Sequence, residues 1–268
     1  AWAWTSDGSS TYSIEPAEKD ERGTTITVFV NEDSQEFLEP YRLKNIVKTH
    51  SDFIAFPIYI EDEVANQQSA IWRRSARDVS DEDYTGFYKQ LSMDFQDPLL
   101  HLHIAADAPV QFYSLLYVPS SADRGMFNTR TEHGLKLYAR KVLIQNYNTD
   151  FLPNYLRFVD GVVDSEDLPL NVARESIQTT RTIKRIGNSI KGKLLGEFES
   201  LAENDPDKYT AFWNAFGVFI KEGIATEPGD SERLAKLLRF HSSISDGETP
   251  SVSLEDYVSR MKDDQEHI

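Results

Sequence analysis

The 268-residue sequence contains no cysteine and few glycines and prolines. The absence of cysteine excludes a disulfide scaffold, a cysteine-ligated zinc site and a thiol nucleophile. With 13 glycines and 11 prolines, the chain is neither collagen-like nor of low complexity. No apolar run approaches the roughly 18 residues of a membrane span, and the first ten residues do not resemble a secretion signal. The common phosphate-loop, dinucleotide, serine-hydrolase and HExxH motifs are also missing.

Hydrophobic residues make up 40% of the chain and aromatic residues 12%, which is enough apolar mass for a sizeable core. The formal net charge is −16. Such a charge repels phosphates and anionic lipid, so we expect neither a nucleic acid nor a membrane as partner. Both ends of the sequence have the character of a chain interior, and we expect a fragment of a larger protein.

Alternating and helical patterns predict an α/β layered fold. Residues 2–14 and 24–30 read as strands, 34–51 as a helix, and a boundary is expected near Ile58. Further along, the patterns predict a helix over 82–95, strands over 100–105, 110–118 and 135–145, and an almost wholly helical region from about Val172 onward.

Two polar features of the chain favour structural over catalytic roles. His101 and His103 face the same side of a predicted strand and could hold a metal, but no third ligand is evident in the sequence. A satisfied or exposed histidine pair is therefore favoured, and we expect no metal site. The acidic stretch Asp164–Pro169 is interpreted as a solvated loop that leads into a helix.

The charge distribution has one anomaly, between Asn171 and Gly196. This stretch holds six basic residues and one acidic residue within a strongly acidic chain. Arg174, Gln178 and Arg181 fall along one helical face. An arginine near a helix start opposes the helix dipole, a small cost that is better tolerated when the guanidinium has an anionic target. Periodicity alone favours a solvated basic face over such a target.

Several motifs together resemble the heat-shock protein 90 chaperone family, of the HtpG type. The most specific is GVVDSEDLPLNVARESIQ, residues 161–178. The others follow in the expected order and cover essentially the whole chain: WTSDG at 4–8, RGT at 22–24, HSDFIAFP at 50–57, FYK at 87–89, DF at 94–95 with PL at 98–99, and YVSRM at 257–261.

The resemblance implies three parts. Residues 1–58 correspond to the closing strands and helix of the family's N-terminal ATP-binding domain, a strand-strand-helix remnant of it. Residues 59–203 correspond to the large αβα lobe of the middle domain, and 204–268 to a truncated helical segment of that domain. The family's Mg-ATP motifs and its C-terminal dimerisation domain are absent from the sequence. The short passage from Phe56 into the middle domain is similar to bacterial or mitochondrial members, which places the protein in the cytoplasm or the mitochondrial matrix.

By the same resemblance, Arg174 is the arginine that reaches the γ-phosphate of ATP, and Gln178 assists it at the same site. Thr24 matches a threonine beside the adenine, so Thr24 and Arg174 are the cofactor-contacting residues. Trp72 matches an exposed tryptophan that contacts client proteins, and burial against its own domain is the equal alternative. Arg124 stands where the family has an aromatic client contact, and Met126 and Phe127 are its possible substitutes.

The resemblance therefore implies the middle segment of an ATP-dependent chaperone, with ATP and Mg²⁺ as cofactors of the full-length homodimer. Its partners would be unfolded or partly folded clients and its own N-terminal domain. The alternative is a catalytically silent module that docks clients or co-chaperones. We expect the isolated chain to be monomeric and to bind no ATP, with Arg174 exposed or resting on Asp164, Glu166 or Asp167.

Overall fold

The computed structural model describes residues 1–108, 110–122, 132–168, 181–243, 249–265 and 267. Contacts within the chain divide it into two compact units, residues 1–42 and 43–268. Helix and strand are combined in the second unit, and the predicted α/β class is confirmed. None of the described helices has the combination of length and apolar character that crossing a membrane requires.

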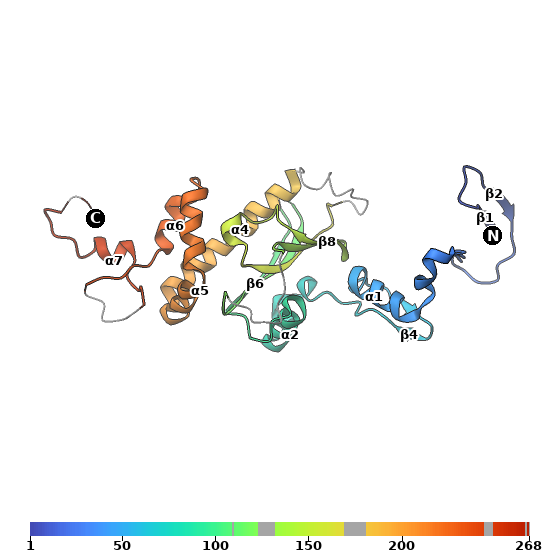
Figure 1. Cartoon of the computed structure of the whole chain (residues 1–268), viewed down its shortest axis with the longest axis horizontal. Helices are drawn as coiled ribbons and strands as arrows, with labels where there is room; N and C mark the ends of the chain where they lie inside the picture. Colours follow the sequence, from blue (N-terminus) through green and yellow to red (C-terminus); the bar gives the residue numbers. More distant parts are fainter. Residues whose placement is uncertain (109, 123–131, 169–180, 244–248, 266, 268) are drawn as a thin grey trace. The chain divides into compact units, whose positions relative to one another are not determined.

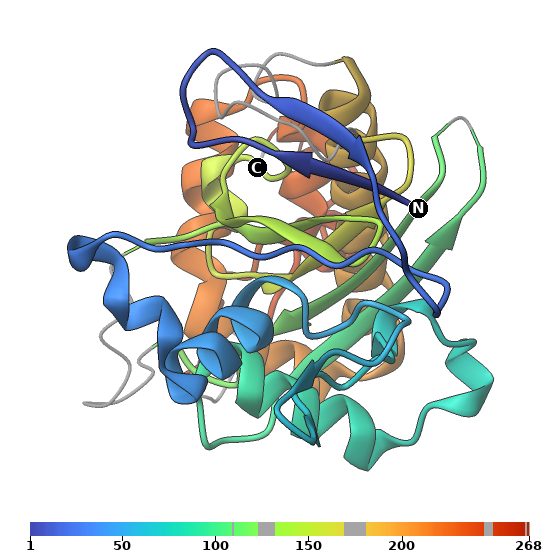
Figure 2. The same ribbon diagram turned by 90° about the vertical axis from the view of Figure 1, so that its right-hand side faces the viewer.

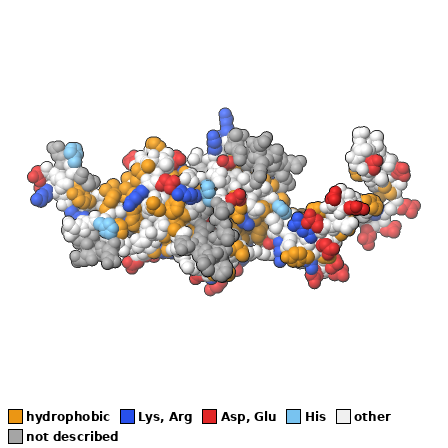
Figure 3. Space-filling model, in the orientation of Figure 1, with side chains coloured by type: hydrophobic (Ala, Val, Ile, Leu, Met, Phe, Trp, Pro, Cys, Tyr) orange, Lys and Arg blue, Asp and Glu red, His pale blue; other side chains and the backbone are white. Residues whose placement is uncertain are grey.

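The first unit contains a short hairpin of β1 (Trp2–Thr5) and β2 (Ser13–Pro16), in which Trp4 pairs with Ile14. The 3-10 helix η1 (Glu32–Leu38) follows, and α1 (Pro40–His50) continues into the second unit. The acidic side chains of this unit are exposed and appear red in Figure 3.

Three predictions for this part of the chain are wrong. The strand expected over residues 2–14 is a hairpin, in which the chain turns back between β1 and β2. Residues 24–30 form no strand, because β-branched composition gives only a propensity and a strand also needs a partner for its backbone groups. The helix expected over 34–51 is divided between η1 and α1 at Pro40. Proline lacks an N–H and fits the first turn of a helix better than its interior.

The second unit is built on a five-stranded sheet (Figure 1). Its strands follow the order β5-β6-β9-β7-β8, and only the pairing of β7 with β9 is parallel. The strands are β5 (Leu100–Ala106), β6 (Phe112–Val118), β7 (Leu135–Ala139), β8 (Val142–Asn148) and β9 (Asp160–Ser165). A small hairpin of β3 (Tyr59–Ile60) and β4 (Glu63–Val64) precedes them.

Two features of this sheet differ from the prediction. The single strand expected over 135–145 is the start of a hairpin, which turns at Arg140 and Lys141 with φ of 51° and 68°. The central strand β9 was not predicted, because its residues DGVVDS include few with high strand propensity. Its two valines face opposite sides of the sheet, and each enters a different hydrophobic cluster.

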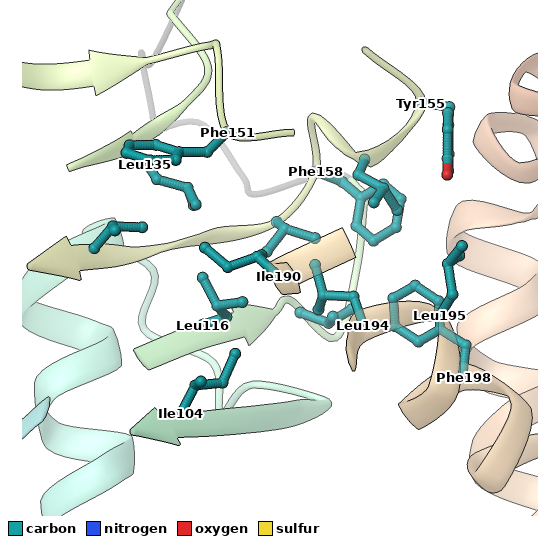
Figure 4. Close-up of a cluster of buried hydrophobic side chains, with 14 of the residues drawn as sticks. Ile104, Leu116, Leu135, Phe151, Tyr155, Phe158, Ile190, Leu194, Leu195 and Phe198 are labelled. Atoms are coloured by element: carbon teal, nitrogen blue, oxygen red, sulfur yellow. The ribbon is translucent and has the colours of Figure 1, made fainter. Parts of the chain in front are cut away.

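Helices cover both faces of the sheet, as Figures 1 and 2 show. On one face, α2 (Asp81–Ser92), begun by a capping box at Ser80, packs with the 3-10 turn η2 (Ile71–Arg73). The larger core lies on the other face. Its helices are α4 (Arg181–Asn204), α5 (Pro206–Thr226) and α6 (Ser231–Leu237). Figure 4 shows side chains of this core, among them Leu116, Ile190, Phe158 and Phe198.

Three short elements complete the described chain: the 3-10 turns η3 (Ala76–Asp78) and η4 (Asn154–Leu156) and the helix α7 (Leu254–Val258). The predicted helical region is confirmed from Arg181 to Leu237, and within it Ile183, Ile186, Ile190 and Leu194 form a fully buried stripe. Beyond Leu237 the described residues are helical only in α7. The larger core is continuous from the sheet through α6, across residues 203 and 204.

Candidate functional site

The candidate site lies at the end of β9, where the sheet leads into the segment that carries Arg174. Every residue of β9 is buried, because the strand is paired on both sides and covered on both faces. The close packing requires Gly161: a Cβ at this position would lie 2.5 Å from the backbone oxygen of Leu115 on β6. β9 is therefore held tightly in place by the strands and helices around it.

Asp164 is a fully buried carboxylate near the end of this strand. Its Oδ2 accepts hydrogen bonds from Trp72 Nε1 at 2.9 Å and from Arg73 Nε at 2.7 Å. Its Oδ1 accepts from the backbone N–H of Lys141, at the turn between β7 and β8, at 3.2 Å. Burying a carboxylate is costly unless it is paired and hydrogen-bonded, and these three donors supply both.

Arg73 connects this buried carboxylate to a second, exposed one. Its NH1 donates to Glu166 Oε1 at 2.7 Å, while its Nε is held by Asp164. The guanidinium also lies 4.4 Å from the ring centre of Tyr113. Burial acts to lower the pKa of Arg73, but the hydrogen bonds and charges of the two carboxylates outweigh it and raise that pKa overall. Arg73 therefore stays cationic.

Ser165 and Asp167, which follow Asp164, are both hydrogen-bonded to Gln111, the residue before β6. The Ser165 hydroxyl donates to the backbone oxygen of Gln111 at 2.7 Å, and the backbone N–H of Gln111 donates to Asp167 Oδ2 at 3.1 Å. The Asp167 N–H donates in turn to the Ser165 hydroxyl at 3.3 Å. The described part of the stretch interpreted from the sequence as a solvated loop, residues 164–168, is therefore partly buried and tied to the sheet.

Trp72 is fully buried, so of the two alternatives left open by the sequence the structure has burial against its own domain and not exposure on the surface. Its ring packs against Phe53 and Tyr138, with centroid distances of 4.6 and 4.9 Å. Its indole N–H donates to Asp164. The polar residues before it in the sequence suggested a surface loop, but the turn η2 directs the ring into the cluster between α2 and the sheet.

Of the histidine pair, His103 is hydrogen-bonded within the protein and His101 makes a ring contact. His103 Nε2 donates to the backbone oxygen of Trp72 at 3.1 Å, and its Nδ1 lies 2.7 Å from the Tyr84 hydroxyl. The His101 ring stacks on Tyr84, and burial lowers the pKa of His101. Over the described residues, no group of three or more histidines and carboxylates could hold a metal ion.

Five residues singled out in the sequence lie outside the described residues: Arg174, Gln178, Arg124, Met126 and Phe127. The contacts of these five residues are therefore not described, and the expectation that Arg174 rests on a carboxylate stays a prediction. The three carboxylates of that expectation, however, already accept hydrogen bonds from other donors.

The remaining site residue, Thr24, is exposed in the first unit and belongs to no strand. The basic stretch is described from Arg181, which is exposed, onward. Within it, Lys191 forms an ion pair with Asp230 at 2.8 Å. This contact agrees with the interpretation of the basic stretch as a face that pairs with acidic neighbours.

Sequence reasoning missed the pair of Arg73 and Asp164. Their separation of 91 residues leaves no local pattern to detect. The available signal was the position of Asp164 inside the most specific motif, directly after two valines. A charged residue there must either be solvated or find a partner, and only the folded chain supplies the partner.

Comparisons with known proteins agree with the resemblance. The family model described as Hsp90 protein matches residues 59–268. The chain is 41% identical to chaperone protein HtpG of Halorhodospira halophila over 283 aligned residues, which cover 99% of this chain and 45% of that protein. It is 42% identical to chaperone protein HtpG of Escherichia coli K12 over 277, covering 99% and 44%. The chain thus spans less than half the length of these relatives, and it belongs to the Hsp90 family.

Proposed function

We propose that this chain is the middle segment of an ATP-dependent chaperone and supplies Arg174 to ATP hydrolysis. The observation that carries the proposal is the family match over 59–268, which includes the whole motif 161–178. The anchored end of β9 supports it, because a residue that must reach a phosphate on another domain needs a rigid base. Arg174 follows that base by ten residues, counted from Asp164.

An arginine suits this role for electrostatic reasons. Phosphoryl transfer requires positioning and charge stabilisation more than covalent chemistry, so a cation brought in from another domain can control the rate. The guanidinium is planar and always charged, and it can bind two phosphate oxygens at once. Gln178, four residues later, is proposed to assist at the same phosphate.

Neither Arg73 nor Thr24 forms a phosphate site within this chain. Arg73 is committed to two carboxylates, and Thr24 is exposed in the first unit. The proposal therefore assigns the Mg-ATP pocket to the N-terminal domain of the full-length protein, with Thr24 as a minor contributor. Binding energy for the nucleotide would come from that domain, and this chain would affect the rate of hydrolysis.

We further propose the division into 1–58, 59–203 and 204–268. The start of the family match at residue 59 supports the first boundary. Exposed aromatic side chains of the first unit, Trp2, Trp4 and Phe29, support the assignment of residues 1–58 to a domain that would cover them. The second boundary is a subdivision within one continuous core.

Client binding is proposed for Met126 and Phe127. The buried Trp72 is not included, since its side chain presents no surface to a partner. The proposed partners are unfolded or partly folded proteins, the N-terminal domain and a second copy of the full-length chain. The two relatives compared above are bacterial, which favours the bacterial type of this protein.

The test is Arg174→Ala in the full-length protein, with Arg181→Ala as the matched control from the same basic stretch. We expect ATP turnover to fall at least ~100-fold, since arginines supplied to a phosphoryl group contribute roughly 10³–10⁵ to the rate. Nucleotide affinity, measured by calorimetry, should change less than about twofold, and Arg181→Ala should behave as the parent. Unchanged turnover in Arg174→Ala would refute the proposal and favour a silent docking module.

A further inference from the structure

We propose that three residues lock the passage from α1 into the second unit, residues 51–58, onto that unit. They are Asp52, Phe53 and Asn66, and we call them the linker lock. Each of the three is buried, with 6%, 7% and 7% of its surface exposed. The inference rests on the proposed function, because it refines the division of the chain given there: it places the joint between the two parts before Asp52 and not at residue 58.

Asn66 makes three hydrogen bonds to the backbone of the passage. Its Nδ2 donates to the backbone oxygens of Ile54 and Phe56 at 3.0 Å each, and its Oδ1 accepts from the N–H of Ile58 at 2.9 Å. Because a carbonyl only accepts and an N–H only donates, these partners fix which end of the amide faces which group. The Ile58 oxygen in turn accepts from the N–H of Ala65 at 2.8 Å. The end of the passage is therefore held by Asn66 and the residue before it.

These bonds replace the partners that secondary structure would provide. Residues 54–58 belong to no helix or strand, and Pro57 has no N–H to donate. Backbone groups withdrawn from water need hydrogen-bond partners, and Asn66 is the partner of three such groups. An alanine at this position would offer neither donor nor acceptor, and an ionised aspartate would offer no donor. The side-chain amide is thus specific to this task.

Asp52 fastens the other end of the passage to the same loop. Its Oδ1 accepts from the backbone N–H of Gln67 at 3.0 Å, and its backbone oxygen accepts from the N–H of Gln68 at 3.0 Å. Burial raises the pKa of Asp52, and the hydrogen bond from Gln67 acts against that rise. Both ends of the passage are therefore bonded to residues 65–68.

Phe53 supplies the apolar part of the lock. Its ring lies 4.6 Å from the ring centre of Trp72 and 5.9 Å from that of Tyr138, inside the cluster between α2 and the sheet. Trp72 follows Asn66 by six residues, so the loop that holds the passage leads directly into the same cluster. The polar bonds of the lock therefore start from a packed base.

The contacts are weaker on the other side of Asp52. No residue of α1 is buried. Lys44 of α1 pairs with Glu63 of β4, which is labelled next to α1 in Figure 1, but the Glu63 side chain is 75% exposed. Exposed ion pairs contribute little to stability, because water and salt screen them. A change in the position of residues 1–42 relative to the second unit would therefore take place before Asp52.

The first experiment measures amide hydrogen exchange in the unaltered 268-residue chain by NMR. After correction for intrinsic rates, the N–H of Ile58 should exchange at least ~100-fold more slowly than the amides of residues 24–30, which lie in an exposed stretch outside any strand. This comparison needs no substitution, so loss of folding cannot obscure it. Equal rates in the two places would show that the passage is not locked.

The second experiment repeats the measurement in Asn66→Ala, with Gln67→Ala as the matched control. Gln67 is exposed and contributes only its backbone N–H to the lock, which alanine retains. Exchange at Ile58 should become about 10- to 100-fold faster in Asn66→Ala, because its backbone partners are left unpaired, and change less than about twofold in Gln67→Ala. The amides of β9 report the stability of the whole unit and should accelerate less than Ile58. Unchanged exchange at Ile58, or equal acceleration in β9, would overturn the role of Asn66.

Spin labels test where the joint lies. The chain has no cysteine, so label pairs can be introduced at exposed positions. The distance distribution between Phe56→Cys and Lys193→Cys should be as narrow as that between Val218→Cys and Lys193→Cys, and it should widen in Asn66→Ala. With the first label at Phe29→Cys the joint lies between the labels, and the distribution should be broader. A broad distribution for the Phe56 pair, or an equally narrow one for the Phe29 pair, would overturn the placement of the joint.

Failure of the proposed function would be a different result. It would appear as unchanged ATP turnover in the full-length Arg174→Ala variant, which involves none of the residues of the linker lock. The exchange and spin-label measurements need no nucleotide and no turnover, so the two outcomes are separate.

Discussion

Replacing Trp72 by alanine tests whether this side chain belongs to the core or to a contact surface. The ring is fully buried, and truncation of such a residue costs about 3–5 kcal/mol through lost transfer energy and the cavity left behind. The variant also deprives Asp164 of one donor, and a hydrogen bond to a charged group contributes about 1.5–3 kcal/mol. Because the two effects share one site and do not add fully, we expect a loss of about 5 kcal/mol.

The assay is urea unfolding of the 268-residue chain, followed by far-ultraviolet circular dichroism. With an m-value of about 2.5 kcal/mol/M, a loss of about 5 kcal/mol lowers the midpoint by about 2 M. Trp72→Phe keeps an aromatic ring beside Phe53 and Tyr138 but removes the N–H, so it should lose about 1.5–3 kcal/mol. Trp4→Ala is the control, since Trp4 is 64% exposed. A loss below about 0.5 kcal/mol in Trp72→Ala, the range of surface substitutions, would refute the burial of this residue.

Two further predictions concern Gly161 and His101. Gly161→Ala should destabilise the chain by about 2–3 kcal/mol in the same assay, because its Cβ meets the β6 backbone. Gly86→Ala has open space at an exposed position of α2 and should stabilise the chain by about 0.5–1 kcal/mol, so equal effects of the two substitutions would contradict the close approach of β6 and β9. The pKa of His101 is lowered from 6.5, so the unfolded chain binds the proton more readily and stability falls as the pH drops from about 6.5 toward the folded pKa. His101→Phe keeps a ring on Tyr84, does not titrate and should lose less stability between pH 7 and 5; an identical loss would show that His101 does not contribute.

Much of the candidate site could be located from the sequence, because its strongest motif is continuous. Residues 161–178 carry the family resemblance in one stretch, and the comparisons confirm the family. The position of Trp72 could not be predicted in the same way. The polar stretch 66–69 before it and the two arginines after it suggest a surface, while the residues that enclose it, Phe53 and Tyr138, are distant along the chain.

The sequence by itself determined the elements whose pattern is local. The patterns predicted strands over 100–105 and 110–118, which are β5 and β6, and a helical region that contains α4 and α5. These predictions succeed because the apolar pattern of a helix or a strand repeats within a few residues.

Only the tertiary structure decided the features that depend on distant partners. β9 is the central strand despite its weak propensity, since β6 and β7 pair with it on either side. Residues 24–30 have the stronger propensity and yet form no strand. Asp164 is buried because Trp72, Arg73 and Lys141 bring it three donors from elsewhere in the chain. Backbone pairing and the compensation of a buried charge are properties of the assembled fold, and no local pattern in the sequence records them.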